Sequence, residues 1–235
     1  MATTTRTPET HGTTRTHNDC DPATRVTRSL LGYGVLAGPF YVSVALAQVF
    51  TRDGFDPAVH QWSMLALGDH GWIQVANLTL TGLMLVAFAV GLGRALTPGR
   101  GARWAPRLVA AYGISLVAAG AFRADAAYGF PVGTAEGPGD ISWHGMLHLA
   151  AGAVGFTCLA VACFVLARRY TADGRLTWAV FSRIVGVVFL AGFGAVAVGA
   201  GAAAANLAFT AAIVLVFGWI TAVALDRYRR TVSPS

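Results

Sequence analysis

Lysine is absent from this sequence, and charge of either sign is scarce. Only 12% of the 235 residues are charged, and all 17 basic residues are arginine. A soluble domain carries about 25% charged residues, so this composition indicates a membrane protein. Arginine without lysine, beside abundant alanine, glycine and valine, is typical of GC-rich bacterial genomes, and we therefore expect the plasma membrane of a bacterium.

Cysteine is the next scarce residue. Cys20 lies in a polar segment, whereas Cys158 and Cys163 lie five residues apart in an apolar one. This spacing forms neither a disulfide framework nor a Cys-x-x-Cys metal site. We expect the two cysteines of the apolar segment to pack as small hydrophobic side chains.

Large apolar side chains are almost missing from the first 28 residues, which are rich in threonine, arginine, histidine and proline. Such a segment cannot bury a core, so we predict that residues 1–28 form a disordered cytoplasmic tail. The segment also has no apolar stretch like that of a signal peptide, and we expect no cleavage there.

Six long apolar runs follow this tail. Each has about 18 to 25 residues, which is enough for a helix to cross a hydrocarbon core of about 30 Å. The sequence therefore predicts an all-α, polytopic membrane bundle of six transmembrane helices within residues 29–226. The runs cover residues 30–50, 72–96, 105–122, 143–167, 178–198 and 202–225.

Arginine is distributed unevenly among the connections between these runs. All but Arg52 and Arg123 lie in the two tails, in the second-to-third connection, or in the fourth-to-fifth connection and the start of the fifth run. Basic residues stay on the cytoplasmic side, so we expect both termini in the cytoplasm, with residues 227–235 as a C-terminal tail. The net charge of +6 then faces anionic membrane lipids, and nucleic-acid binding is not expected.

Polar side chains gather at the opposite, predicted outer end. The two long outer loops, residues 51–72 and 122–148, hold every histidine outside the N-terminal tail. Amides lie in the outer halves of the helices, where burial is costly unless they are paired. We therefore predict a polar crevice that opens to the outside, with the candidate ligand-binding residues His144, His148, Asn77, Gln74, Arg52, Arg123 and Asp125.

The histidines of these loops are also candidate zinc ligands. His144 and His148 are four residues apart, which places them on one helix face at a spacing that can chelate a metal ion. The pattern is weak, because the zinc-protease motif requires glutamate where Gly145 stands. In the structural alternative both imidazoles hydrogen-bond to the loop and hold it over the bundle. Further metal ligands would come from His60, His70, Asp125 or Asp140.

The two outer arginines also allow two interpretations. Arg52 adjoins Asp53, and Arg123 lies two residues from Asp125, so each arginine could form an ion pair within its own loop. Alternatively, the two guanidiniums together could hold an anionic headgroup or a carboxylate, whose oxygens suit the arginine fork.

The outer loops carry a family resemblance. The segments R-D-G-F-D, S-M-L-A-L-G and G-W-I-Q-V-A-N, followed by G-F-P and H-G-M-L-H, resemble the domain of unknown function 998 family over about residues 28–225. The resemblance implies a bacterial or archaeal membrane protein of about six helices, and it implies no activity or catalytic residues. The family often has Asp-Pro in the second loop, whereas Asp125 is followed here by Ala126.

Three classes of function fit these features. The first is a non-enzymatic membrane protein that binds a lipid or small ligand from the outside, or that holds a protein partner. The second is a metal-dependent hydrolase at the outer leaflet, with zinc as its candidate cofactor and Ser63 or Ser142 nearby. The third, a transporter, is disfavoured because the inner halves of the helices hold few polar groups.

Overall fold

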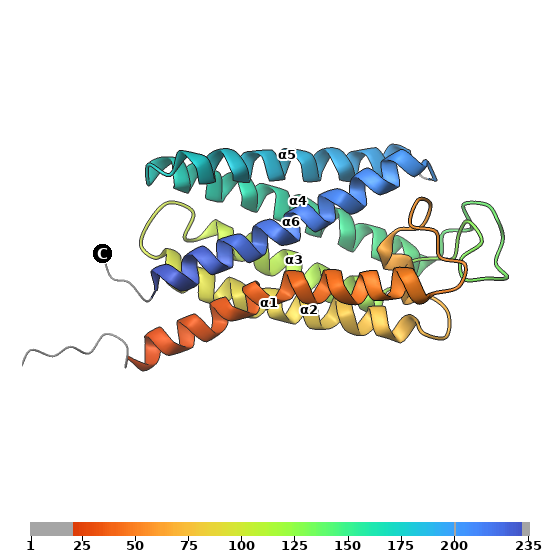
Figure 1. The fold of residues 1–235 in the computed structure, drawn as a ribbon, viewed down its shortest axis with the longest axis horizontal. Helices are drawn as coiled ribbons and strands as arrows, with labels where there is room; N and C mark the ends of the chain where they lie inside the picture. The colour runs from red at the N-terminus through yellow and green to blue at the C-terminus, as the bar shows by residue number, and fades with distance from the viewer. Residues whose placement is uncertain (1–20, 200, 232–235) are drawn as a thin grey trace, which may run out of the picture.

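Six long α-helices and one short 3-10 helix make up the structure (Figure 1). It is a computed structural model that describes residues 21–199 and 201–231. The elements in chain order are α1 (Pro22–Thr51), η1 (Trp62–Ala66), α2 (Gly71–Leu96), α3 (Trp104–Ala121), α4 (Trp143–Ala172), α5 (Leu176–Val198) and α6 (Ala203–Arg230).

The six apolar runs each coincide with a helix, so the all-α prediction is confirmed. The largest difference in the boundaries is at α1, which begins at Pro22, within the segment expected to be disordered. Asp21 explains the early start, because its carboxylate accepts hydrogen bonds from the N–H groups of Ala23 and Thr24. Proline at the first helical position supports the same start. The predicted disorder of residues 1–20 lies outside the described residues.

The C-terminal end of α6 also runs past the predicted boundary. The helix continues to Arg230, so residues 227–230 of the expected tail are helical. Residues 232–235 lie outside the described residues.

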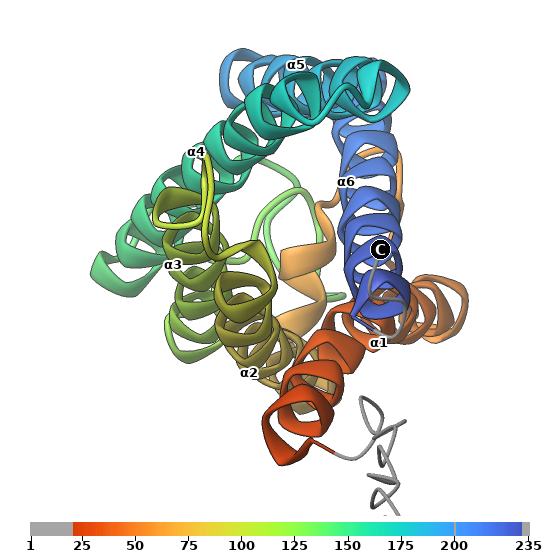
Figure 2. The same ribbon diagram turned by 90° about the vertical axis from the view of Figure 1, so that its left-hand side faces the viewer.

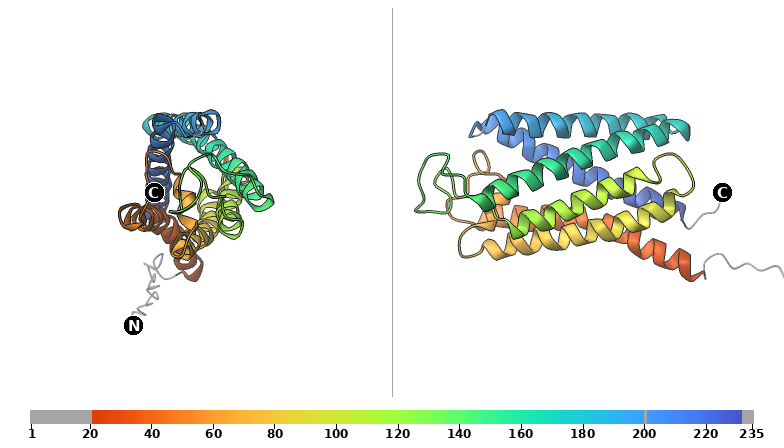
Figure 3. Two further views of the ribbon diagram at one scale, coloured as in Figure 1. Left: turned by 90° about the vertical axis from the view of Figure 1, so that its right-hand side faces the viewer. Right: turned by 180° about the vertical axis from the view of Figure 1, so that it is seen from behind.

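The helices form a closed ring. Each packs against the next along the chain, and α6 returns to pack against α1 (Figure 2). Short connections after α2, α4 and α5 favour this order, because antiparallel helices joined by a short connection become neighbours. The two described chain ends lie at one end of the ring, called here the inner end, and the two long loops lie at the other, the outer end (Figure 3).

Aromatic side chains fill the inside of the ring. Tyr41 of α1 stacks on Phe217 of α6, with ring centroids 4.5 Å apart. Tyr112 of α3 contacts both Phe217 and Phe156 of α4, and Phe156 in turn meets Phe189 of α5. Five of the six helices are therefore joined through one continuous set of aromatic contacts, which occupies the position that an aqueous path along the axis would need.

Small residues allow a close contact between α2 and α3. A Cβ atom on Gly113 of α3 would lie 2.7 Å from the carbonyl oxygen of Gly82 on α2. Only glycine at both positions lets the two backbones approach so closely, as in the small-residue packing of membrane helices.

Five of the helices are long and apolar enough to cross a membrane, and the chain is a multi-pass membrane protein. The helix outside this group is α3, which has 18 residues, or about 27 Å at 1.5 Å per residue. Trp104, Pro106 and Arg107 in its first turn lower its mean hydropathy. α3 nevertheless lies inside the ring order between α2 and α4.

Candidate functional site

The first outer loop folds back into the mouth of the ring. Its 3-10 helix η1 buries Trp62, Met64 and Leu65, and Trp62 packs against Tyr41 with ring centroids 5.9 Å apart. Figure 2 shows η1 inside the outline of the six helices. We call residues 52–70 together with residues 122–142 the outer cap, because they cover the outer end of the ring.

Arg52 holds the first loop of the outer cap. Its guanidinium donates hydrogen bonds to the carbonyl oxygens of Leu65, at 3.1 Å, and Leu67, at 2.6 Å. The same group lies 5.4 Å from the centroid of the Phe130 ring in the second loop. Burial lowers the pKa of the Arg52 guanidinium, and the nearby charge of Asp69 opposes this effect. Arg52 therefore closes its own loop and touches the other one.

His60 joins the two loops of the outer cap. Its Nδ1 accepts a hydrogen bond from the N–H of Asp56, so Nε2 must carry the proton that it donates to the carbonyl oxygen of Tyr128, at 2.9 Å. The ring also packs between Phe55 and Phe130 and is 3% exposed. Both nitrogens of this candidate metal ligand are thus used for the backbone.

Asn206 attaches the outer cap to α6. Its amide nitrogen donates to the carbonyl oxygens of Pro57 and His60, at 2.8 and 3.1 Å. Arg52, His60 and Asn206 therefore fix the first loop at several points along its backbone. Backbone groups that a loop buries need such partners, because they have no ladder of regular hydrogen bonds.

Three amides form a buried cluster between α1 and α2. Gln74 Oε1 accepts hydrogen bonds from Gln48 Nε2, at 2.8 Å, and from Asn77 Nδ2, at 3.1 Å. Asn77 also donates to the carbonyl oxygen of Tyr41. The sequence analysis expected Gln74 and Asn77 in an open crevice, but here they are 0% and 1% exposed. Gln48 Oε1 and Gln74 Nε2 remain buried without a partner among the described residues.

His148 binds the end of another helix. Its Nδ1 lies 3.1 Å from the carbonyl oxygen of Ala119 and 2.9 Å from that of Phe122. Two carbonyl oxygens can only accept, so Nδ1 carries a proton shared between them. The last carbonyls of a helix lack partners within it, and His148 of α4 supplies one for the C-terminus of α3.

Asp125, Ser142 and His144 form a partly exposed polar group at the start of α4. Ser142 Oγ lies 2.5 Å from Asp125 Oδ1 and 2.7 Å from His144 Nδ1, and it accepts the N–H of Gly145. Asp125 also accepts the backbone N–H of Ser142. A carboxylate cannot donate, so the hydroxyl proton of Ser142 points to Asp125, and His144 donates to Ser142. The group caps α4 and ties the second loop to it.

The predicted site is therefore divided into separate groups. No hydrogen bond or ion pair within residues 21–199 and 201–231 joins the amide cluster to His144, His148 or Arg123. Arg123, His70 and Asp140 are exposed. Neither of the two interpretations of the outer arginines included the backbone carbonyls to which Arg52 donates its hydrogen bonds. In the same part of the chain, no three His, Cys, Asp or Glu side chains come close enough together to hold a metal ion.

The sequence analysis did not identify the role of η1. Its segment W-S-M-L-A is apolar although it lies in an outer loop, and that contrast is the signal for a segment that folds back into the bundle. The joint role of Ser142 and Asp125 was also missed. Serine immediately before an apolar run is a common N-cap, which marks the position of this group.

Replacing Arg52 by glutamine should loosen the outer cap. The variant loses charged hydrogen bonds to two carbonyl oxygens, each worth about 1.5–3 kcal/mol, and leaves these oxygens poorly paired. We expect a lower melting temperature in detergent and faster proteolysis within residues 53–70. Arg123→Gln is the matched control, because Arg123 is exposed in the other loop. Equal effects of the two substitutions would contradict the role assigned to Arg52.

A family model matches most of the chain, over residues 35–226, and its description is Protein of unknown function (DUF998). The match includes all of both outer loops and confirms the resemblance seen there. No curated protein and no solved structure shows significant similarity to the chain. The chain belongs to the DUF998 family.

Proposed function

We propose that this chain is a six-span protein of a bacterial plasma membrane, with both termini in the cytoplasm, that acts by binding rather than by catalysis. The ligand is a small polar molecule or a lipid headgroup that reaches the amide cluster from the outer side. The observation that carries this proposal is the buried, unpaired acceptor and donor of Gln48 and Gln74 beneath the outer cap. Buried polar atoms normally have a partner, so this pair offers a place for one.

The topology is supported by the uneven distribution of arginine. Within the described residues, Arg52 and Arg123 lie at the outer end, and every other arginine lies toward the inner end, where both described chain ends also lie. The positive-inside rule then assigns the inner end to the cytoplasm. An even number of spans is required for this arrangement, which makes α3 the sixth span.

A metal-dependent hydrolase is the second candidate, and the contact among Ser142, His144 and Asp125 is the observation in its favour. The direction of the hydrogen bonds opposes it. In a hydrolytic triad histidine accepts the proton of serine, whereas here that proton points to Asp125. Ser142 Oγ also receives the N–H of Gly145 as the N-cap of α4. The structural alternative for these residues is therefore better supported than catalysis.

Transport is the third candidate, and the interior of the ring opposes it. The aromatic contacts from Tyr41 through Phe217 and Tyr112 to Phe156 cross the ring at its centre. Transported ions and polar substrates need polar or ionisable groups near the middle of the membrane. The buried amides instead lie in the outer part of α1 and α2.

Reporter fusions test the six-span topology in a bacterial host. Alkaline phosphatase fused after Gly133 should be active, because the enzyme folds only outside the cytoplasm, and fusions after Gly99 and Gly174 should be inactive. A fluorescent protein after Ser235 should be fluorescent. If the Gly99 and Gly133 fusions behave alike, α3 does not cross the membrane and the proposed topology is wrong.

Metal analysis separates the structural role of the histidines from the hydrolase. We expect no stoichiometric zinc on the purified wild-type protein. His148→Ala should lower the melting temperature by several degrees, because it leaves the carbonyl oxygens of Ala119 and Phe122 unpaired. His144→Ala is the control and should have a smaller effect, since its side chain is 48% exposed. One zinc per chain that is lost in either variant would support the hydrolase instead.

Native mass spectrometry of protein extracted in mild detergent tests ligand binding at the amide cluster. We expect a bound mass on the wild-type chain that is lost in Gln48→Met, which removes the unpaired acceptor and keeps the length of the side chain. Thr81→Val is the control at the edge of the cluster, because it leaves both unpaired atoms in place. A wild-type spectrum without any bound mass, or equal loss in both variants, would contradict the proposal.

A further inference from the structure

The inner end of the ring contains a cleft lined by arginines. The cleft has a volume of about 550 Å³ and lies between the α2–α3 connection, α4 and α5. Arg100, Arg168 and Arg183 line it, together with the hydroxyl of Thr171 and the side chains of Trp104 and Val165. Three guanidiniums from three separate segments thus border one concave surface.

Hydrogen bonds hold two sides of this cleft in place. Arg183 Nη2 donates to Thr171 Oγ1 at 2.9 Å, which joins α5 to α4. Arg169 Nη1 donates to the carbonyl oxygens of Leu96, at 2.7 Å, and Arg100, at 3.1 Å, and so fixes the α2–α3 connection against α4. The backbone that carries Arg100 is therefore positioned before any ligand arrives.

No carboxylate of residues 21–199 and 201–231 pairs with the three guanidiniums. The described acidic residues at this end are Asp21, Asp173 and Asp226. Asp21 caps α1, Asp173 pairs with Arg169, and Asp226 pairs with Arg175, Arg227 and Arg230. Among the described residues, Arg100, Arg168 and Arg183 form no ion pair. Their charges remain available for an anion, and arginine suits phosphate oxygens because it can donate two parallel hydrogen bonds.

Trp104 supports a position of the cleft at the level of the lipid headgroups. It is 58% exposed and begins α3, at the inner end of the helix. Tryptophan concentrates at this level of a membrane, with its apolar ring toward the acyl chains and its N–H toward water. A cleft beside it is open both to headgroups and to the upper part of the chains.

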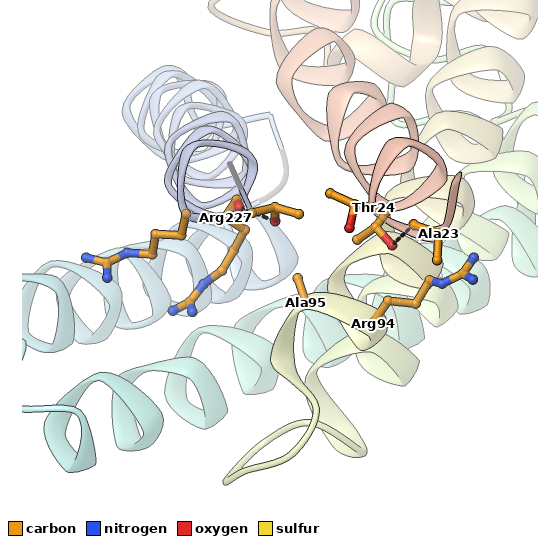
Figure 4. A pocket seen from close by; sticks show the side chains of 8 residues that line it. Ala23, Thr24, Arg94, Ala95 and Arg227 are labelled. Atoms are coloured by element: carbon orange, nitrogen blue, oxygen red, sulfur yellow. Dashed lines mark hydrogen bonds between the residues drawn. The ribbon is translucent and has the colours of Figure 1, made fainter. Parts of the chain in front are cut away.

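The other two arginine-lined clefts fit an anion less well. The cleft in Figure 4 is lined by Arg94, Arg227 and Arg230, but Arg227 and Arg230 already pair with Asp226. Figure 4 also shows Arg94 and Arg227 extending in opposite directions. The third cleft, between α2 and α3, includes Arg94, Arg103 and Arg107. The guanidinium carbons of Arg103 and Arg107 each lie 5.8 Å from the centroid of the Trp104 ring. These two guanidiniums therefore already have a cation–π partner.

We propose that the cleft of Arg100, Arg168 and Arg183 is a specific site for the phosphate group of an anionic phospholipid in the cytoplasmic leaflet. Basic pockets between helices on this side of a membrane recognise such headgroups. The site rests on the proposed topology, but it lies at the end of the ring opposite the amide cluster and does not depend on ligand binding there.

Native mass spectrometry of the full chain with added lipids tests the site. Phosphatidylglycerol should bind with one tight site per chain in preference to phosphatidylcholine. Arg100→Gln/Arg168→Gln should weaken this binding by about tenfold or more, since each arginine near an anionic headgroup contributes to the affinity. The charge-conserving Arg100→Lys/Arg168→Lys should keep most of the binding, which separates loss of charge from loss of folding.

The matched control is Arg103→Gln/Arg107→Gln, which removes the same charge from the neighbouring cleft and should leave the tight site intact. Equal weakening by both glutamine pairs, or no preference for phosphatidylglycerol in the wild type, would overturn the proposal. Excess inorganic phosphate or glycerol 3-phosphate should leave the lipid bound. Full displacement by either would assign the cleft to a soluble phosphate compound and overturn the lipid site.

Discussion

A polar group that is buried in this bundle, away from water, needs a hydrogen-bond partner in the chain, because hydrocarbon offers none. The outer end of the ring follows from this constraint. Its first loop turns an apolar segment, η1, into the ring, and the backbone carbonyls buried with it must then be paired. Arg52 and Asn206 donate hydrogen bonds to those carbonyls, and His60 pairs with the carbonyl of Tyr128 in the second loop. The same requirement explains His148, which pairs the last carbonyls of α3. Most of the residues that resemble a catalytic set in the sequence therefore make hydrogen bonds that hold the outer cap in place.

The same constraint also identifies the buried polar atoms that the outer cap leaves without a partner. In the amide cluster, Gln74 Oε1 accepts two hydrogen bonds. In contrast, Gln74 Nε2 donates no hydrogen bond and Gln48 Oε1 accepts none among the described residues. Gln48 and Gln74 come from different helices, and leucine pairs would have filled the same volume without leaving polar atoms unpaired. The cost of the unpaired atoms is therefore avoidable in principle, which is the reason for assigning them to a ligand rather than to packing.

Much of the fold could be predicted from the sequence, because apolar length alone identifies a helix that crosses lipid. The start of α1 could not, because the expected boundary followed hydropathy, whereas the observed one follows the local cap of Asp21 and Pro22. The site was predicted less well. Spacing along a helix shows that His144 and His148 share a face, but it does not show that their nitrogens face Ser142 and the end of α3. Those partners are distant in sequence or depend on hydrogen-bond direction, and neither is visible in a pattern of residue types.

The two ends of the ring use arginine in opposite ways. At the outer end, Arg52 donates its hydrogen bonds to the backbone of the first loop. At the inner end, arginines outnumber carboxylates, and the few carboxylates are shared within small networks such as that around Asp226. A surplus of charge at the membrane surface destabilises the folded chain by self-repulsion unless lipid anions offset it. In the proposed topology, the arginines of the inner end therefore do more than orient the chain in the membrane. In that topology, the anionic lipids of the cytoplasmic leaflet help to stabilise the bundle, and the cleft of Arg100, Arg168 and Arg183 is the proposed site where that interaction becomes specific.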